Sequence, residues 1–212
     1  MKKQLVLAFF CVAWTLTASA QQTVESIRKE YQDVKEWIAR MSNDFPSDGI
    51  PPEYYDLQIR QNLPGTGLHK EDIRMFYGEL EPEEEGDPYP PHYLRFATSK
   101  YNFAAREFYE EFLYDDKGQV MFIYAQTPDV TLSELWPYEL RMWFDGKRLI
   151  RFMAKKAEKP LESIDIPSLR KATFKEECTG KTIPEKFRDE AKRCQQSAQR
   201  FLAMFKGIDD NN

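Results

Sequence analysis

Histidines, which much acid–base and metal chemistry uses, are few in this chain: His69 and His92 are the two, beside 35 carboxylates spread along the sequence. Hydrolysis by a metal, a serine or a cysteine usually needs a histidine that a second group holds in place. The sequence contains no HExxH, GxSxG or paired-cysteine zinc motif that would supply this arrangement. No residue is therefore assigned as catalytic or metal-binding, no cofactor is expected, and a hydrolase using a carboxylate with His69 or His92 is the alternative function.

Glu110 and Glu111 are adjacent carboxylates within an expected strand. Successive side chains of a strand point to opposite faces of the sheet, so these two cannot act as an acid and base pair on one bond. We interpret each as an ordinary strand residue. The acidic, proline-rich segment 79–91 lacks the oxygen spacing of a calcium loop, and a solvated loop is expected there.

A hairpin at residues 138–153 carries the clearest candidate for a binding surface. Two aromatic-rich runs flank the turn Asp145-Gly146-Lys147. A two-residue loop would mix charged side chains into both faces, whereas a three-residue loop shifts the register by one and separates them. Because register follows the hydrophobic pattern where one face is buried, we predict the three-residue loop. This register assigns to the core face Tyr138, Leu140, Met142, Phe144, Ile150 and Phe152, and to the other face Glu139, Arg141, Trp143, Leu149, Arg151 and Met153.

We nominate Arg141, Trp143, Arg151 and Tyr124 as the binding residues, the last from the preceding hairpin. Arginine beside aromatic rings binds carboxylates, phosphates or sugars through paired hydrogen bonds and stacking. The alternative is that both arginines pair with Glu139 and with a glutamate of the next strand, on a solvated face of the sheet.

The N-terminus has the organisation of a signal peptide. Lys2 and Lys3 precede an apolar run that ends at Leu16, and Ala18-Ser19-Ala20 forms a small-residue cleavage site. The run is short for a membrane span, which needs about 20 residues. We predict a signal peptide over 1–20, a single mature domain over 21–212 without a stable membrane anchor, and a secreted or periplasmic location.

Two cysteines, Cys178 and Cys194, remain after that cleavage. An exported chain meets an oxidising compartment, so the pair is predicted to form a disulfide that fastens the C-terminal helix to the segment before it. Closing a loop of this length with a disulfide would add roughly 3 kcal/mol to the free energy of unfolding. A metal or redox pair is the alternative, but the CxxC spacing is missing.

Hydrophobic periodicity predicts the elements that must position these residues. Residues 23–43 repeat apolar side chains at helical spacing. A C-terminal helix begins at Thr182, where Glu185 completes a capping box, and carries an apolar stripe that includes Cys194. The segment after Met153 fits an edge strand or a loop crossing the sheet. Aromatic and branched runs between turn residues predict strands at 55–60, 73–80, 93–97, 107–114, 120–124, 138–144 and 148–153.

These elements predict an α+β domain: an antiparallel sheet of five to seven strands with the N-terminal and C-terminal helices on one face. The stretch from Leu113 through Asp115-Asp116-Lys117-Gly118 to Tyr124, followed by 139–151, resembles a meander of small exported bacterial proteins of uncharacterised function. That resemblance implies a secreted α+β domain and supplies no catalytic residue.

The formal net charge of −5 argues against nucleic acid and anionic membranes as partners. Together with the missing catalytic motifs, this favours an exported, non-enzymatic binding or interaction protein, monomeric, whose partner is an envelope protein, a peptide or a glycan. The competing hypotheses are the hydrolase and a purely structural accessory subunit.

Overall fold

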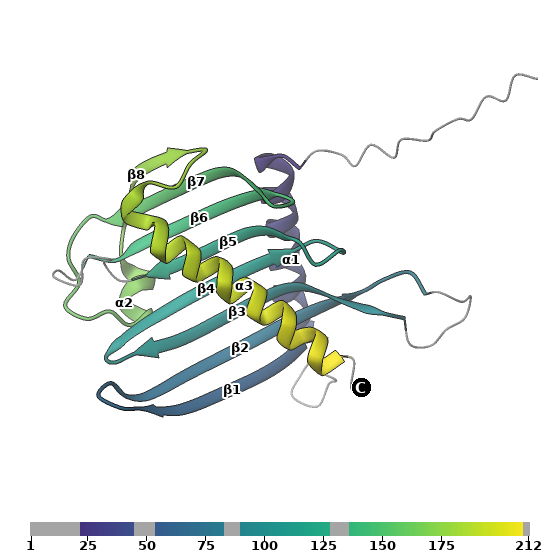
Figure 1. Ribbon diagram of the computed structural model, residues 1–212, viewed down its shortest axis with the longest axis horizontal. Coiled ribbons are helices and arrows are strands. Elements are labelled where there is room, and N and C mark those ends of the chain that lie inside the picture. Colours follow the sequence, from purple (N-terminus) through teal and green to yellow (C-terminus); the bar gives the residue numbers. More distant parts are fainter. Residues whose placement is uncertain (1–21, 45–53, 83–89, 128–135, 210–212) are drawn as a thin grey trace, which may run out of the picture.

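The computed structural model describes residues 22–44, 54–82, 90–127 and 136–209. The predicted signal peptide, 1–20, lies outside the described residues, as does most of the acidic segment 79–91. The described part forms one antiparallel sheet in which each strand pairs with the next along the chain (Figure 1). Its strands are β1 (Tyr54–Leu63), β2 (Gly67–Glu79), β3 (His92–Phe103), β4 (Arg106–Tyr114), β5 (Val120–Thr127), β6 (Tyr138–Asp145), β7 (Arg148–Ala157) and β8 (Phe174–Gly180).

The antiparallel α+β architecture is confirmed, but the sheet has eight strands rather than the predicted five to seven. The additional strand is β8, an edge strand that pairs with β7 from Phe152 to Ala157. Its sequence, Phe-Lys-Glu-Glu-Cys-Thr-Gly, has no apolar alternation, because an edge strand that is largely solvent-exposed buries few side chains. This strand therefore depends on backbone hydrogen bonds to β7, and its side chains show no pattern from which a strand could be predicted.

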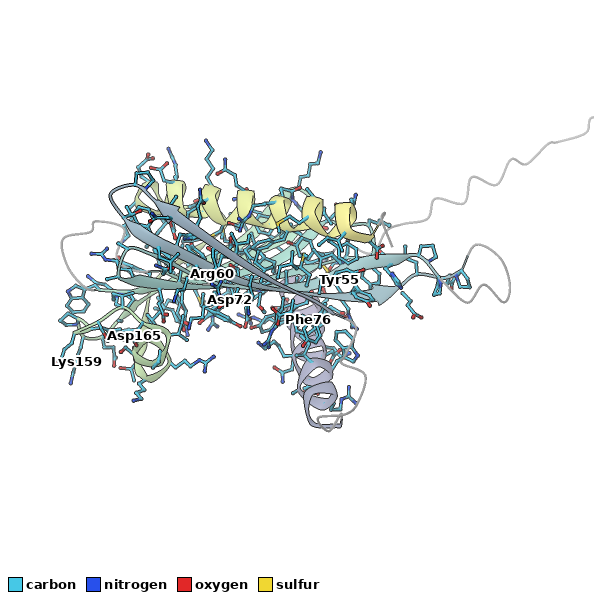
Figure 2. All side chains as sticks on the ribbon, turned by 90° about the horizontal axis from the view of Figure 1, so that it is seen from below. Tyr55, Arg60, Asp72, Phe76, Lys159 and Asp165 are labelled. Carbon is cyan, nitrogen blue, oxygen red and sulfur yellow. The ribbon has the colours of Figure 1, made fainter. Side chains whose placement is uncertain are left out.

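Helices cover both faces of the sheet, so the prediction that they share one face is wrong. α1 (Val24–Asp44) and the short α2 (Ile166–Lys171) lie on one face, and α3 (Arg188–Asp209) crosses the other (Figures 1 and 2). The reason is that central strands are apolar on both sides: Phe112 and its neighbour Leu113 are both fully buried, in different clusters. A sheet of this kind needs cover on each face.

The larger core lies under α3. The 3-10 turn that leads into this helix lies over β6 and β7, where Phe187 contacts Tyr138 and Phe152, and the helix ends over β1 and β2, where Phe205 contacts Tyr55. The predicted capping box of Thr182 and Glu185 is wrong. A 3-10 turn at Glu185–Phe187 precedes α3. The N-cap of this turn is Pro184, and no side chain forms a capping hydrogen bond with it.

Cys178 and Cys194 are free thiols, which corrects the predicted disulfide. Cys178 lies on β8 opposite Ala154, whereas the Cys194 sulfur lies 3.8 Å from Glu110 Oε1 on β4. Four strand spacings of about 4.8 Å separate β4 from β8. A disulfide requires Cα atoms within about 7 Å, so the diagonal course of α3 carries Cys194 out of reach of Cys178.

The β6–β7 hairpin keeps most of the predicted faces but not the predicted pairing. The three-residue loop predicts Met142 opposite Ile150, whereas Met142 lies opposite Phe152 and Trp143 opposite Arg151. Its turn differs from the prediction. Asp145 pairs with Arg148, which leaves a two-residue turn, and a bulge between Trp143 and Phe144 shifts the pairing by one more residue, so that Met142 and Phe152 share a face. As a result Leu149 contacts the core under α3 and Ile150 the core under α1, the reverse of their predicted faces.

Candidate functional site

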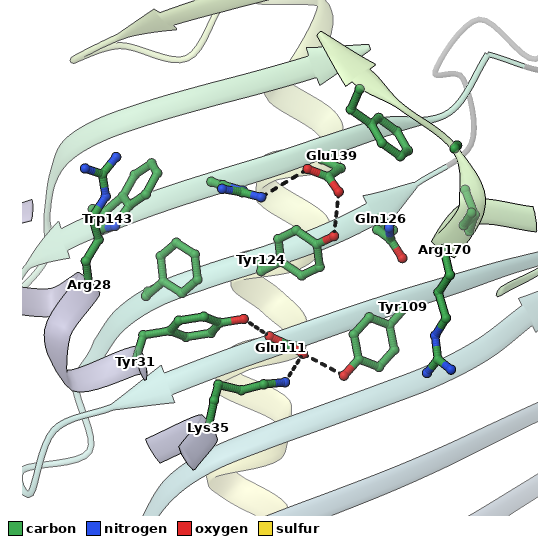
Figure 3. A pocket seen from close by; sticks show the side chains of 15 residues that line it. Arg28, Tyr31, Lys35, Tyr109, Glu111, Tyr124, Gln126, Glu139, Trp143 and Arg170 are labelled. Carbon is green, nitrogen blue, oxygen red and sulfur yellow. Dashed lines mark hydrogen bonds and ion pairs between the residues drawn. The ribbon is translucent and has the colours of Figure 1, made fainter. Parts of the chain in front are cut away.

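A pocket of about 540 Å³ lies on the face of the sheet that carries α1 and α2 (Figure 3). Three adjacent strands, β4, β5 and β6, form its floor. α1 forms one wall, and α2 with the start of β8 forms the other. We call this site the α1–α2 pocket; its lining residues are Arg28, Tyr31, Lys35, Tyr109, Glu111, Phe122, Tyr124, Gln126, Glu139, Arg141, Trp143, Leu169, Arg170, Ala172 and Phe174.

The strand register arranges the floor in rows that run across the three strands. Glu111, Tyr124 and Arg141 are mutually opposite and form the central row. One row nearer α2 is polar and contains Tyr109, Gln126 and Glu139. The row nearer the start of α1 is apolar and contains Leu113, Phe122 and Trp143. The floor therefore changes from apolar to polar along the strands.

Glu111 is the best-connected carboxylate of the pocket, although it is only 3% exposed. Its Oε1 accepts hydrogen bonds from Tyr109 and Lys35, each at 2.7 Å, and its Oε2 accepts one from Tyr31. Tyr31 and Lys35 belong to α1, so this carboxylate ties the helix to the floor. Burial, and then the charge of Glu111, raise the pKa of the Tyr31 and Tyr109 hydroxyls far above the ordinary value, so both phenols stay protonated donors.

Glu139 has a similar environment on β6. The Tyr124 hydroxyl donates to its Oε1 at 2.9 Å, and Arg141 Nη2 donates to its Oε2 at 3.2 Å. The Arg141 guanidinium lies 5.5 Å from the centre of the Tyr124 ring. Burial and the neighbouring Glu139 raise the pKa of Tyr124. Both pocket carboxylates thus accept from protonated tyrosines and from a cation.

The two ends of the pocket each carry a further arginine. At one end Arg28 of α1 lies over the Trp143 ring, 5.4 Å from its centre. At the other, Arg170 projects from α2 (Figure 3). α2 is held by its N-cap Asp165, which accepts from Ser168 N at 2.8 Å, and by the burial of Leu169. Neither Arg28 nor Arg170 forms an ion pair with a carboxylate among the described residues.

Three of the four nominated binding residues, Tyr124, Arg141 and Trp143, line this pocket together. Arg151 does not line it; its guanidinium lies 5.7 Å from the Trp143 ring. Arg141 also forms the predicted pair with Glu139, so the alternative interpretation of this face is correct for that one contact. The nominated residues are therefore neighbours, while their binding role stays a prediction.

The histidines lie on the opposite face of the sheet. His69 Nδ1 is 2.6 Å from the Asn102 carbonyl oxygen, beside Arg193 and Arg200 of α3. His92 Nδ1 is 3.1 Å from Asp209 near the end of α3. Neither histidine reaches Glu111 or Glu139, because the sheet separates them.

Sequence reasoning missed most of the cationic and carboxylate groups of the pocket. Glu111 was interpreted as an ordinary strand residue, although it is buried and binds three side chains. Arg28, Tyr31 and Lys35 follow a spacing of three and four on α1, which is a signal that they share one helix face. No sequence signal was available for Arg170, because α2 was not predicted.

No family model, no curated protein and no solved structure matches this chain. The resemblance of residues 113–151 to small exported bacterial proteins therefore stays a prediction. Among the described residues, no cluster of three or more histidine, cysteine or acidic side chains is placed to hold a metal ion. None of the described helices combines the length and apolarity required to cross a membrane.

Proposed function

We propose that this protein is an exported, non-enzymatic binding protein whose α1–α2 pocket holds a small organic anion with a flat apolar part. The observation that carries the proposal is the charge of the pocket. Four cationic side chains, Arg28, Lys35, Arg141 and Arg170, line it with only two carboxylates, in a chain whose net charge is −5. Lys35 and Arg141 pair with those carboxylates, which leaves Arg28 and Arg170 to attract an anion.

The floor supports the apolar part of this ligand. Phe122 and Trp143 lie in the floor at the Arg28 end, where they are only 5% and 2% exposed, and the half-buried Tyr124 continues the aromatic floor toward the centre. Ligand pockets commonly combine such apolar walls with a few polar groups that orient the ligand. An anion at one end and a ring against the aromatic floor would use both parts of this pocket.

Binding is favoured over hydrolysis for a chemical reason. A general base must be free to take a proton from its substrate. Glu111 and Glu139 already accept hydrogen bonds from tyrosines and cations, and the raised pKa values of Tyr31, Tyr109 and Tyr124 keep these phenols from acting as bases near neutral pH. The export of the protein rests on the predicted signal peptide and is part of the same proposal.

Calorimetric titration of the mature chain, residues 21–212, tests the ligand class. The probes are naphthalene-2-carboxylate and naphthyl phosphate, each compared with neutral naphthalene-2-methanol and with acetate or inorganic phosphate, which have no ring. We expect the aromatic anions to bind and both comparison sets to bind at least about tenfold more weakly, the loss expected for one charge-assisted hydrogen bond. Equal binding of the neutral alcohol would contradict the proposal.

Single variants then locate the site. Because Arg28 and Arg170 lie at opposite ends of the pocket, either Arg28→Ala or Arg170→Ala should weaken binding of the aromatic anion about tenfold, and the variant that does so identifies the end that holds the anion. Arg188→Ala is the matched control, because Arg188 is an exposed arginine outside the pocket that pairs with Glu185. Release of naphthol from naphthyl phosphate, abolished by a double substitution of His69 and His92, would instead favour the hydrolase.

A further inference from the structure

β1 lies at the edge of the sheet, and β2 is its single strand partner among the described residues. The strand is ten residues long, and the backbone donors and acceptors on its outer side have no strand to pair with in that part of the chain. Long open edges favour pairing with another chain, and proteins usually block them or use them. The side chains of β1 indicate which partner would fit.

We propose that β1 pairs antiparallel with β1 of a second copy of this chain, with Gln58 on the two-fold axis. In this register each Asp56 lies opposite the partner's Arg60, twice per interface. Opposite charges placed directly across two strands stabilise a pair, and like charges destabilise it. The edge is therefore complementary in charge to itself.

Other registers lose this complementarity. A two-fold axis perpendicular to the sheet keeps both α3 helices on one face and allows any one residue of β1 to lie on the axis. Centring on Asp56 or on Arg60 places like charges against each other. Centring on Leu57 or on Ile59 sets both charges opposite uncharged side chains. Of the registers near the middle of the strand, the one centred on Gln58 is the one that forms ion pairs.

The proposed contact extends interactions that already exist within the chain. Arg74 on β2 pairs with Asp56 at 3.2 Å, and Asp72 on β2 pairs with Arg60 at 3.1 Å. The residue directly opposite Arg60 on β2 is Lys70, and Asp72 reaches Arg60 diagonally. Joining two copies would link the Arg74–Asp56 contact of one chain to the Arg60–Asp72 contact of its partner through the new Asp56–Arg60 pair. These side chains are about half exposed in the single chain, with 40% for Asp56 and 41% for Arg60, so a partner can reach them.

The opposite face of β1 is apolar and would meet an apolar face of the partner. Leu57 and Ile59 are partly buried against the core under α3 and alternate with the charged residues. The register that joins Asp56 to the partner's Arg60 also sets Leu57 opposite the partner's Ile59. Two copies would thereby join their sheets and extend the apolar layer across the junction, which replaces the monomer expected from sequence.

Sedimentation equilibrium of the mature chain over a wide concentration range tests this inference. We expect the wild-type chain to dimerise, and Asp56→Arg and Arg60→Asp to be folded monomers when alone, because each places like charges on both sides of the axis. Mixed in equal amounts, these two variants should form a heterodimer, since every charge pair is then opposite. Lys29→Asp, a charge reversal on the exposed side of α1, is the control and should dimerise as the wild type does.

A second variant covers the case in which a charge reversal fails to fold. Gln58 lies opposite Asp72 on β2, so Gln58→Lys introduces a favourable contact within one chain but sets two lysines together on the axis. It should keep the melting temperature and raise the dimer dissociation constant about tenfold or more. A wild-type chain that stays monomeric, or folded variants that dimerise alone, would overturn the proposal.

Discussion

Glu110 and Glu111 are consecutive residues of β4, and their carboxylates are buried on opposite faces of the sheet, with exposures of 1% and 3%. Glu110 pairs with Arg193 of α3 at 2.6 Å. Glu111 pairs with Lys35 of α1 at 2.7 Å and accepts from Tyr31. One dipeptide thus holds both long helices, and a change in either carboxylate should loosen a different layer of the protein.

The hydrogen bond from Tyr31 to Glu111 should stabilise the docking of α1. Tyr31→Phe removes the hydroxyl and leaves a buried carboxylate with fewer donors, so we expect a loss of about 1.5–3 kcal/mol in the free energy of unfolding. Chemical denaturation measures this loss. Tyr54→Phe is the control, because the Tyr54 hydroxyl has no hydrogen-bond partner among the described residues; equal losses for the two variants would contradict the assignment.

Glu110 should make stability depend on pH in an unusual direction. Burial raises the pKa of its carboxyl, and Arg193 offsets only part of this effect. The folded chain therefore binds this proton more tightly than the unfolded chain. The contribution of Glu110 to stability is present below the unfolded pKa, about 4.3, and is lost as pH rises through the folded pKa.

Denaturant unfolding of wild type and Glu110→Gln, from neutral pH down to about 4.5, isolates this effect. The stability of the wild type relative to the variant should rise as pH falls. Asp145→Asn is the comparison, because the hydrogen bond from Arg148 lowers the pKa of Asp145, so its contribution stays nearly constant over this range and is lost only at lower pH. The same slope for both variants would show that Glu110 titrates as an ordinary carboxyl.

Arg200 and Glu71 form the second buried carboxylate contact of α3. Arg200 binds both carboxylate oxygens of Glu71, which is 3% exposed and also accepts from Ser99 at 3.0 Å. Removing one partner of a buried pair costs about 3–5 kcal/mol. Because about half of the Arg200 side chain is exposed, we expect Arg200→Ala to lower the free energy of unfolding by about 2–3 kcal/mol. The double variant Arg200→Leu with Glu71→Leu should recover much of this lost stability in denaturant unfolding. A double variant that is less stable than Arg200→Ala would contradict the view that the loss comes from an unpaired buried carboxylate.

The two thiols should differ in reactivity. Cys194 is completely buried on α3, and burial raises its pKa well above the ordinary value. Cys178 is partly exposed, and burial raises its pKa to a smaller degree. An alkylating reagent should modify Cys178 in the folded protein and Cys194 only after unfolding, as mass spectrometry of peptides would show. A mass that changes by two protons on reduction would instead restore the disulfide.

The sequence was sufficient for elements whose signal is local. The helix at 23–43, the hairpin strands and the shared face of Met142 and Phe152 follow from apolar periodicity, and α1 and β6–β7 confirm them. The same face assignment grouped Arg141 with Trp143, and both line the pocket. Period and turn residues determine these features within a few positions of the chain.

The rest of the site depends on contacts between distant segments. Tyr31 and Glu111 are 80 positions apart, and nothing in either neighbourhood indicates that α1 lies across β4. Arg170 belongs to a helix of six residues, too short to show periodicity. The predicted disulfide is wrong for a similar reason. The separation of Cys178 and Cys194 depends on the angle at which α3 crosses the sheet, which the sequence near either cysteine does not determine.

The position of α3 at the end of the described chain sets an order for assembly. Strands β1 to β8 each pair with a neighbour in sequence, so hairpins can form one after another while the chain is being made. The core under α3 cannot close until the final 22-residue helix is free to dock. Until then an apolar face of the sheet is exposed to aggregation, and we expect a nascent or refolding chain to require a chaperone on that surface.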